Sequence, residues 1–286
     1  NPTARKHFTA LYRRPAYANL MEWLADWNEP DPDMVVVAVP PQLQPRLVDE
    51  LLRLTEPRLL LLEKPVAINQ EQGHDLEQTC ARHPTMIVAV NYIRRYLPAV
   101  QMWQQRLQNG HLGRLLHGHI TYGKGVISNG SHFVNLAEAW LGSMQFDRIL
   151  DAGISYLGFD VEASLALHAA DHADAPVLVR SVGEAGLRAG EVDLWFEEGR
   201  LCWQNNGNSI SFWPRCPPTT TDSHATLSEN PRFLATGIEH YQLEVLDNLR
   251  SILQKKIPRP ACTLSSALQT LRILEPAIST QPASRH

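Results

Sequence analysis

Residues 59–65 read Leu59-Leu60-Leu61-Leu62-Glu63-Lys64-Pro65, four consecutive leucines followed by an acid, a base and a proline. Two similar apolar runs flank this stretch, at 34–39 and at 86–90, and helical patterns at 45–54 and 70–82 separate the three runs. Strands that are apolar at every position are buried on both faces. The alternation of strand and helix therefore predicts a parallel sheet covered by helices.

Each of the three apolar runs ends in residues that suit a binding site. The first ends at Pro40-Pro41, the second at Glu63-Lys64 and the third at Asn91-Tyr92. Ligands bind beyond the carboxyl ends of the strands in such sheets. Burial at the mouth of a strand would lower the pKa of Lys64 and make its amine useful in catalysis. The competing interpretation is an ordinary surface lysine at a strand exit.

The chain from about Gly113 onward has a different pattern. Strands follow one another without helices between them, and residues 199–203 form a hairpin return after Glu197-Glu198, which predicts a mainly antiparallel sheet with one packed and one open face. The expected strands are 117–122, 146–153, 162–169, 176–182 and 192–196, the expected helices are 130–141, 238–253 and 264–278, and 214–221 is expected to be a loop.

His132 is the second candidate for chemistry. Gly130 permits a tight turn, Ser131 is able to cap a helix, and His132 would then lie in the first helical turn. A helix N-terminus favours a neutral imidazole, which suits proton exchange near neutral pH. A histidine in a helix cap without any partner is the competing interpretation.

Composition excludes several classes of protein. The net charge of −4 gives no basic excess for nucleic acid, and no apolar run approaches the roughly 20 residues of a membrane span. The four cysteines are far apart, which favours a reducing, cytoplasmic location. Two histidine groups have the composition of metal sites but no third ligand at a fixed spacing, so we expect no metal; they are His117 with His119, and His168 and His172 with Asp171 and Asp174.

Together these segments resemble the Gfo/Idh/MocA oxidoreductases, the relatives of glucose–fructose oxidoreductase and inositol dehydrogenase. The resemblance rests on residues 35–41, on 62–65 and on 91–98, and it continues in 110–114, which is similar to the turn before the second domain of that family. The Asn129-Gly130-Ser131-His132 element resembles the histidine motif of the family, and 241–253 with 264–278 resemble its closing helices.

The resemblance implies an NAD(P)-dependent dehydrogenase or reductase that acts on a hydroxyl or carbonyl carbon of a sugar, polyol or related small molecule. Lys64 would orient the reacting oxygen and His132 would move the proton. Pro40, Pro41, Glu63, Lys64 and Asn91 would line the cofactor. The implied substrate contacts are Tyr92, Arg95, Tyr122, Asn129 and Asn135.

Two departures from the family leave an alternative open. Asn135 stands where many members carry an aspartate, and no Gly-x-Gly-x-x-Gly occurs in the chain. The 1–14 segment resembles the helix after the second strand of the family, and the apolar run at 35–39 would then form a bare edge. We therefore expect the natural protein to be longer. The alternative is a cofactor-deficient, non-catalytic relative that binds a small molecule or regulates.

The expected architecture is an incomplete Rossmann-type parallel sheet at 1–110 followed by an α+β domain at 111–286. The helix at 264–278 would pack back on the first domain. An open antiparallel sheet commonly pairs with its twin, so we expect a homodimer or homotetramer through the second-domain sheet.

Overall fold

The parallel sheet predicted for the first half of the chain is present in the computed structural model, which describes residues 1–28, 31–183, 187, 189–219 and 223–280. Strands β1 (Met34–Val37), β2 (Leu59–Leu62) and β3 (Ile87–Val90) pair in parallel in the order β1-β2-β3. All four leucines of β2 are buried, as expected for the central strand of a covered sheet.

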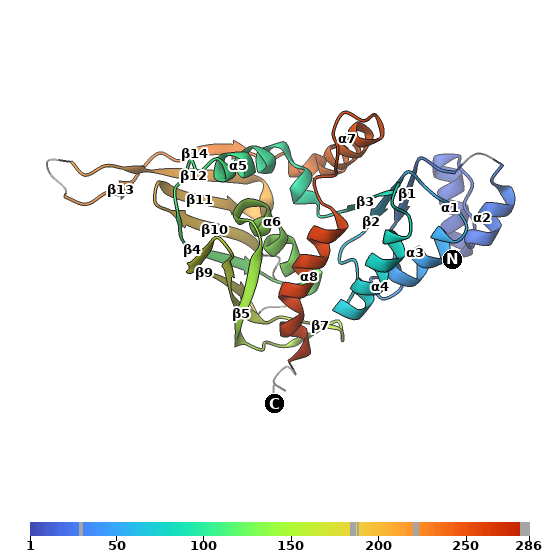
Figure 1. The fold of residues 1–286 in the computed structure, drawn as a ribbon, viewed down its shortest axis with the longest axis horizontal. Coiled ribbons are helices and arrows are strands. Elements are labelled where there is room, and N and C mark those ends of the chain that lie inside the picture. Colours follow the sequence, from blue (N-terminus) through green and yellow to red (C-terminus); the bar gives the residue numbers. More distant parts are fainter. Residues whose placement is uncertain (29–30, 184–186, 188, 220–222, 281–286) are drawn as a thin grey trace.

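Helices lie beside this sheet (Figure 1). Two of them connect the strands, and each begins as the sequence predicts: Pro45 stands in the first turn of α3, and the Asn69 side chain accepts a hydrogen bond from Gln72 N at the start of α4. The helices of this half are α1 (Pro2–Tyr12), α2 (Leu20–Asp26), α3 (Gln44–Leu52) and α4 (Gln70–Ala81). This arrangement confirms the parallel α/β class.

The second half forms a large mixed sheet in the order β13-β12-β11-β10-β4-β9-β8-β5, with β14 beside β12. Neighbouring strands in it are antiparallel except for the parallel pair β4 and β9. Its strands are β4 (Leu115–Tyr122), β5 (Met144–Asp151), β8 (Ser164–Ala169), β9 (His172–Ser181), β10 (Gly190–Phe196), β11 (Gly199–Gln204), β12 (Ser209–Cys216), β13 (Thr226–Leu227) and β14 (Arg232–Ala235). The mainly antiparallel sheet is thus confirmed.

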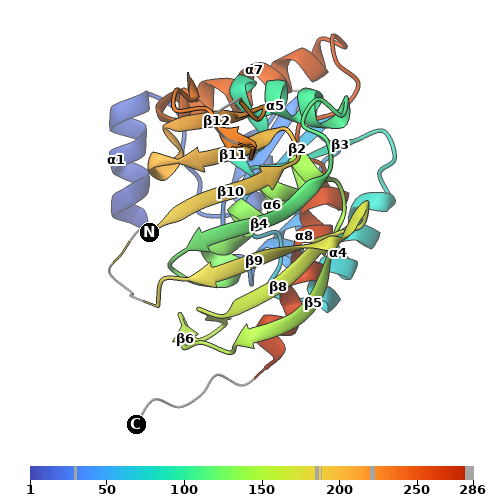
Figure 2. The ribbon, with the colours of Figure 1, turned by 90° about the vertical axis from the view of Figure 1, so that its left-hand side faces the viewer.

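Helices cover one face of this sheet and leave the other open (Figure 2). The covering helices are α5 (Pro98–Gln108), α6 (Ser131–Leu141) and α8 (Leu264–Ser279), while α7 (Tyr241–Leu253) lies near the 3-10 turn η1 (Ile93–Tyr96). Helix α8 also contacts α4 and β3, and Thr263 bridges to Ala89. A Cβ on Gly73 of α4 would lie only 2.9 Å from the Leu268 side chain of α8. The absence of a side chain at Gly73 therefore lets the two helices approach closely.

One local expectation was wrong, because part of the segment expected to be a loop belongs to a strand. Residues 214–216 continue β12, and Pro214 pairs with Gly199 of β11 at the end of the ladder that begins at Ser209. A proline is tolerated at such a position, where its missing N–H does not interrupt the hydrogen bonds of the sheet. Of the expected loop, residues 220–221 lie outside the described residues. The structure also contains elements without a sequence prediction. They are α2, α5, residues 209–213 of β12, β13, β14 and the short pair β6 (Ser155–Tyr156) and β7 (Asp160–Val161).

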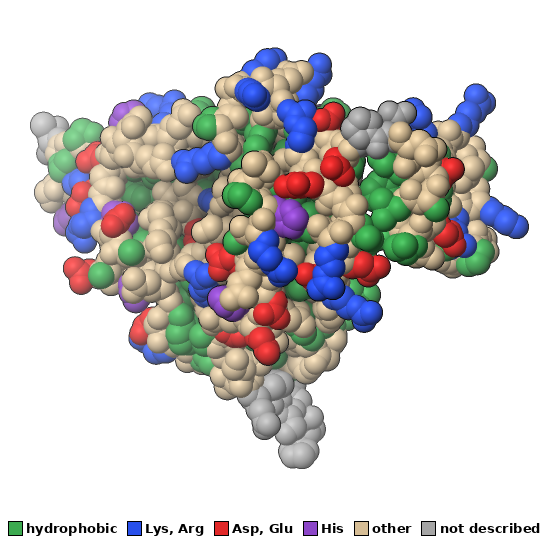
Figure 3. Space-filling view, turned by 45° about the vertical axis from the view of Figure 1, so that its right-hand side comes forward, with side chains coloured by type: hydrophobic (Ala, Val, Ile, Leu, Met, Phe, Trp, Pro, Cys, Tyr) green, Lys and Arg blue, Asp and Glu red, His purple; other side chains and the backbone are tan. Residues whose placement is uncertain are grey.

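Strand β1 pairs with β2 alone among the described residues, so its other edge carries no strand there. Val36 in this strand is 49% exposed, and α1 and α2 contain no buried side chain. Figure 3 shows hydrophobic side chains gathered where this N-terminal part faces the rest of the molecule. The apolar side chains exposed in this region are Phe8, Leu11, Tyr12, Met21, Trp27 and Val36.

A substitution in the central strand β2 tests whether its buried side chains stabilise the first half of the chain. Leu60 is fully buried in β2, so Leu60→Ala is expected to lower the free energy of unfolding by about 2–5 kcal/mol, because a cavity replaces the lost side chain. Leu243, which is 61% exposed on α7, provides the control, and Leu243→Ala should change it by less than about 0.5 kcal/mol. Equal losses in urea denaturation would contradict the assignment of Leu60 to the core.

Candidate active site

The carboxyl ends of the three parallel strands are tied together by hydrogen bonds. Glu63 N donates to Val37 O at 3.0 Å, and Asn91 N donates to Leu62 O at 2.8 Å. The Asn91 side chain then donates to Glu63 Oε1 at 2.6 Å, which holds the residues after β2 and β3 side by side. Pro40 and Pro41 follow β1 at the same edge. The residues predicted to line the cofactor are therefore brought together.

Gln44, for which the sequence makes no prediction, supports this edge through hydrogen bonds. Its side chain is fully buried, and its Nε2 donates to Glu63 O at 2.8 Å and to Val66 O at 3.1 Å. These bonds fix the backbone on both sides of Lys64, where the Lys64–Pro65 peptide is cis. A glutamine at the first position of a helix gives no sequence signal for this role.

Lys64 extends from this edge toward the second half of the chain. Its Nζ donates to Ser128 O at 2.7 Å. Burial lowers the pKa of the Lys64 amine; the carboxylates of Glu63 and Asp160 oppose this shift, and the charge of Arg94 adds to it. The predicted direction of the pKa shift agrees with the structure.

His132 is the second residue of α6 and lies close to the same group of charges. Its ring packs edge-on against Tyr92, with 5.6 Å between the ring centroids. Burial lowers the pKa of His132 well below 6.5, and the positive charges of Arg94 and Lys64 lower it further. The imidazole is therefore neutral at neutral pH, and its Nδ1 is buried without a hydrogen-bond partner among the described residues.

The turn before His132 differs from the predicted cap. Helix α6 continues from a π-helical turn, η2 (Val126–Gly130), and Ser131 Oγ donates to Ile127 O at 2.6 Å instead of capping the helix. Gly130 has helical torsions; a Cβ there would be 3.2 Å from the Tyr122 ring, so close packing explains this glycine. Neutrality of His132 consequently comes from burial and nearby positive charge, and not from a capped N-terminus.

Asp160 holds the η2 turn in place. The carboxylate is 2% exposed and accepts hydrogen bonds from Ile127 N at 3.0 Å and Ser128 N at 2.7 Å. Gly125, with φ +79°, lets the chain pass this carboxylate, since a Cβ would lie 2.2 Å from Asp160 Oδ2. Asp160 thus positions Ser128, whose carbonyl oxygen accepts from Lys64.

This contact predicts that Asp160 is a positioning residue. Asp160→Ala is expected to lower kcat by about 10²-fold, because a shift of about 1 Å in a catalytic group has this effect. Asp160→Asn keeps an oxygen acceptor and should recover part of the loss, and Asp174→Ala, at an exposed aspartate, should leave kcat unchanged. Steady-state kinetics at several pH values check this, and an unaltered kcat in Asp160→Ala would exclude the role.

Arg94 is a second residue that the sequence analysis missed. It is 8% exposed, and its guanidinium carbon lies 4.4 Å from the centroid of the Phe133 ring and 5.7 Å from that of Trp203. A small cavity of about 20 Å³ lies beside it, lined also by Asn129 and Gly190. The predicted substrate contact Asn129 lies here, although its amide donates to Gly123 O at 2.7 Å.

Three predicted substrate contacts lie elsewhere. Tyr122 is fully buried and donates to Ala163 O. Asn135 is fully buried as well, and its amide donates to Thr270 Oγ1 of α8 at 2.9 Å. Arg95 donates to Ser266 Oγ at 2.6 Å, on the side of α8. The structure therefore does not bring these side chains to Lys64 and His132, whereas Tyr92 packs directly on His132.

The histidine groups with metal-like composition have other contacts. His168 Nε2 lies 3.2 Å from Gln145 Oε1, and the His117 ring stacks on Trp195 at 5.7 Å. Within the described ranges, no group of three or more His, Cys, Asp or Glu side chains is arranged to hold a metal ion.

The strand edge fits the nicotinamide end of the expected cofactor. Asn91 Oδ1 is buried and has no hydrogen-bond partner in the described part of the chain, so this acceptor suits the amide N–H of a carboxamide. Pro40, Pro41 and Glu63 would lie alongside. The chain supplies no glycine-rich turn for a pyrophosphate.

Comparisons with known proteins show what the chain is similar to. Residues 1–92 match a family model described as an oxidoreductase family with an NAD-binding Rossmann fold. The predicted cofactor, NAD or NADP, agrees with the description of this family. The model is that of the Gfo/Idh/MocA oxidoreductases, and the first third of the chain is similar to it.

Solved structures share the fold over nearly the whole chain. WlbA dehydrogenase from Bordetella pertussis, solved with NADH and UDP-GlcNAcA, is 18% identical with a TM-score of 0.74, and the match covers 98% of this chain and 84% of that one. An oxidoreductase from Pseudomonas syringae is 16% identical with a TM-score of 0.76, covering 98% and 86%. A 3-ketoreductase from Actinomadura kijaniata, solved with NADP, is 13% identical with a TM-score of 0.71, covering 96% and 85%.

No curated protein sequence matches the chain. None of the helices in the described residues is long and apolar enough to cross a membrane.

Proposed function

We propose that this protein transfers a hydride between NAD or NADP and a hydroxyl-bearing carbon of a sugar, polyol or related small molecule. One observation carries the proposal: Lys64 binds the carbonyl oxygen of Ser128, four residues before His132, and the Lys64 and Arg94 charges both act on the His132 ring. An amine and a neutral imidazole therefore lie together at the carboxyl end of a parallel sheet, where substrates bind in such folds.

The roles follow from the chemistry of each group. The cofactor supplies the hydride acceptor or donor when it is bound. The Lys64 ammonium would bind the reacting oxygen and stabilise the negative charge that develops on it. The neutral His132 imidazole would accept the hydroxyl proton during oxidation and return it during reduction. Arg94 would add positive charge near the same oxygen, and Asn91 and Glu63 would orient the nicotinamide.

The proposal also assigns a separate role to each half of the chain. Residues 1–110 would bind the cofactor and 111–286 would bind the substrate, with α8 joining the two. The open face of the large sheet would pair with a second copy of the chain. In support, Arg200, which is paired with Asp193, lies 5.1 Å from the ring centroids of both Trp195 and Trp213, and tryptophan and arginine are enriched at interfaces.

The test is an activity screen that follows nicotinamide absorbance. The full protein is mixed with NAD(H) or NADP(H) and with free sugars, polyols and nucleotide-linked sugar acids, the last because one structurally similar dehydrogenase was solved with UDP-GlcNAcA. We expect saturable turnover with one of these classes. Saturable sugar binding by calorimetry without any turnover would instead support the non-catalytic alternative and overturn the proposal.

A further inference from the structure

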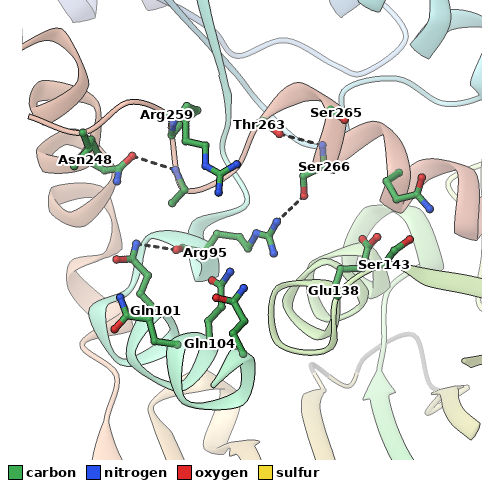
Figure 4. Close-up of a pocket in the computed structure, with 17 residues that line it drawn as sticks. Arg95, Gln101, Gln104, Glu138, Ser143, Asn248, Arg259, Thr263, Ser265 and Ser266 are labelled. Atoms are coloured by element: carbon green, nitrogen blue, oxygen red, sulfur yellow. Dashed lines mark hydrogen bonds between the residues drawn. The ribbon is translucent and has the colours of Figure 1, made fainter. Parts of the chain in front are cut away.

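A second, larger cavity lies between α5, α6, α7, α8 and the segment that precedes α8 (Figure 4). Its volume is about 720 Å³, within the range of small-molecule sites in proteins. Neither Lys64 nor His132 lines it. Helix α6 contributes to both places, with His132 in its first turn and Glu138 at the cavity.

Two arginines from separate segments point into this cavity (Figure 4). Arg95 donates to Ser266 Oγ at 2.6 Å and weakly to Asn135 O at 3.4 Å, while its buried Nε has no acceptor among the described residues. Arg259 is exposed, and no hydrogen bond or ion pair to it is found within the described residues. A guanidinium has five N–H donors, so both side chains retain donors for a ligand.

The single carboxylate of the lining does not neutralise these charges. Thr270 Oγ1 donates to Glu138 Oε2, and burial raises the pKa of Glu138 to about 7. Even when ionised, one carboxylate leaves the two arginines in excess. The cavity is positive in total, which favours an anion.

The rest of the lining is rich in carboxamides and hydroxyls. A carboxamide offers both donors and acceptors, which is the pairing that a polyhydroxyl compound requires. The carboxamide residues are Gln101, Gln104, Gln105, Gln108, Asn248 and Gln269. Of these, Gln101 already donates to Arg95 O and helps to fix the backbone of Arg95.

We propose that this cavity is a second binding site, separate from the Lys64–His132 site, for a small sugar or polyol that carries an oxyanion. Arg95 and Arg259 bind the oxyanion through charge-assisted hydrogen bonds, and the carboxamides bind the hydroxyl groups. The oxyanion is a phosphate ester or a carboxylate, since both present the paired oxygens that a guanidinium fork matches. The assignment does not depend on the proposed reaction.

Calorimetric titration tests the site without any turnover. The probes are glucose 6-phosphate, gluconate and uncharged glucose, each titrated into the wild-type protein and into three variants: Arg259→Ala, Arg250→Ala and Lys64→Met. Arg250 is an exposed arginine on α7 outside the cavity lining, so it matches the change of charge.

We expect one of the two anions, or both, to bind about tenfold or more tightly than glucose. Arg259→Ala should weaken that binding by about tenfold or more, and Arg250→Ala and Lys64→Met should leave it unchanged. The tighter anion identifies the oxyanion. The proposal is overturned if neither anion binds below about 10 mM, if glucose binds equally well, or if Lys64→Met and not Arg259→Ala removes the binding.

Discussion

Replacing Lys64 by methionine is expected to lower kcat by about 10²–10³-fold, the loss found when a single group that stabilises a developing oxyanion is removed. The amine is held over the site by Ser128 O at 2.7 Å, and burial lowers its pKa, so its charge acts in a poorly solvated place. Methionine keeps the length of the side chain and removes the charge. Steady-state kinetics by nicotinamide absorbance measure the effect.

The control for this prediction is Lys256→Met, at an exposed lysine after α7. It makes the same chemical change away from the strand edge, and kcat should stay at the wild-type value. A Lys64→Met protein that is folded by circular dichroism and turns over at the control rate would remove Lys64 from the mechanism.

His132→Ala is expected to lower kcat by about 10²–10⁴-fold, the usual contribution of a general acid–base group. It should also change the pH profile. Burial, Arg94 and Lys64 lower the pKa of His132 well below 6.5, so the base form is present at neutral pH and is lost only as the pH falls through that lowered pKa. In wild type, the acid limb of the kcat/KM profile for oxidation should therefore lie below pH 6.5, and this limb should be absent in His132→Ala.

An exposed histidine provides the comparison for this variant. His111→Ala, in the turn after α5, should keep both the rate and the acid limb of the profile. If His132→Ala retained the same acid limb as wild type, some other group would be the proton acceptor.

The strand ends could be predicted from sequence because their pattern is local. Four buried leucines require a strand covered on both faces, and a residue directly after such a strand has to emerge at the carboxyl edge of the sheet. This reasoning predicts the positions of Lys64 and Asn91. The hydrogen bond from the Asn91 side chain to Glu63 is not predicted, but Lys64 and Asn91 lie at the edge of the sheet where the sequence places them.

Arg94 and Arg95 show where this reasoning fails. Both lie in the 3-10 turn η1, in which successive side chains point about 120° apart. One of the two therefore faces Phe133 and the Lys64–His132 group while the other faces α8. The pattern of the two residues is identical, and only the packing of α6 and α8 around the turn decides between them.

Asn135 and Asp160 depend on partners that are distant in sequence. Asn135 stands one turn after His132, which suggests the same helix face, but Thr270 of α8 binds its amide inside the core. Asp160 binds Ile127 N and Ser128 N across 33 and 32 residues. Rules for residue spacing and for helix caps use neighbours in the sequence and do not include such contacts. The π-helical turn and the Asp160 carboxylate that holds it therefore could not be predicted.

The central claim is that Lys64 and His132 act on one reacting oxygen, and a double-mutant cycle on single-turnover hydride transfer tests it most directly. The rate is measured for wild type, Lys64→Met, His132→Ala and the double variant, with NADH or NADPH saturating. When two groups act as a unit, removing one of them already costs most of the rate that the pair provides. The double variant should therefore be no more than about tenfold slower than the slower single variant. A double variant whose rate loss equals the full product of the two single losses would show that the two side chains work independently, and would contradict the account.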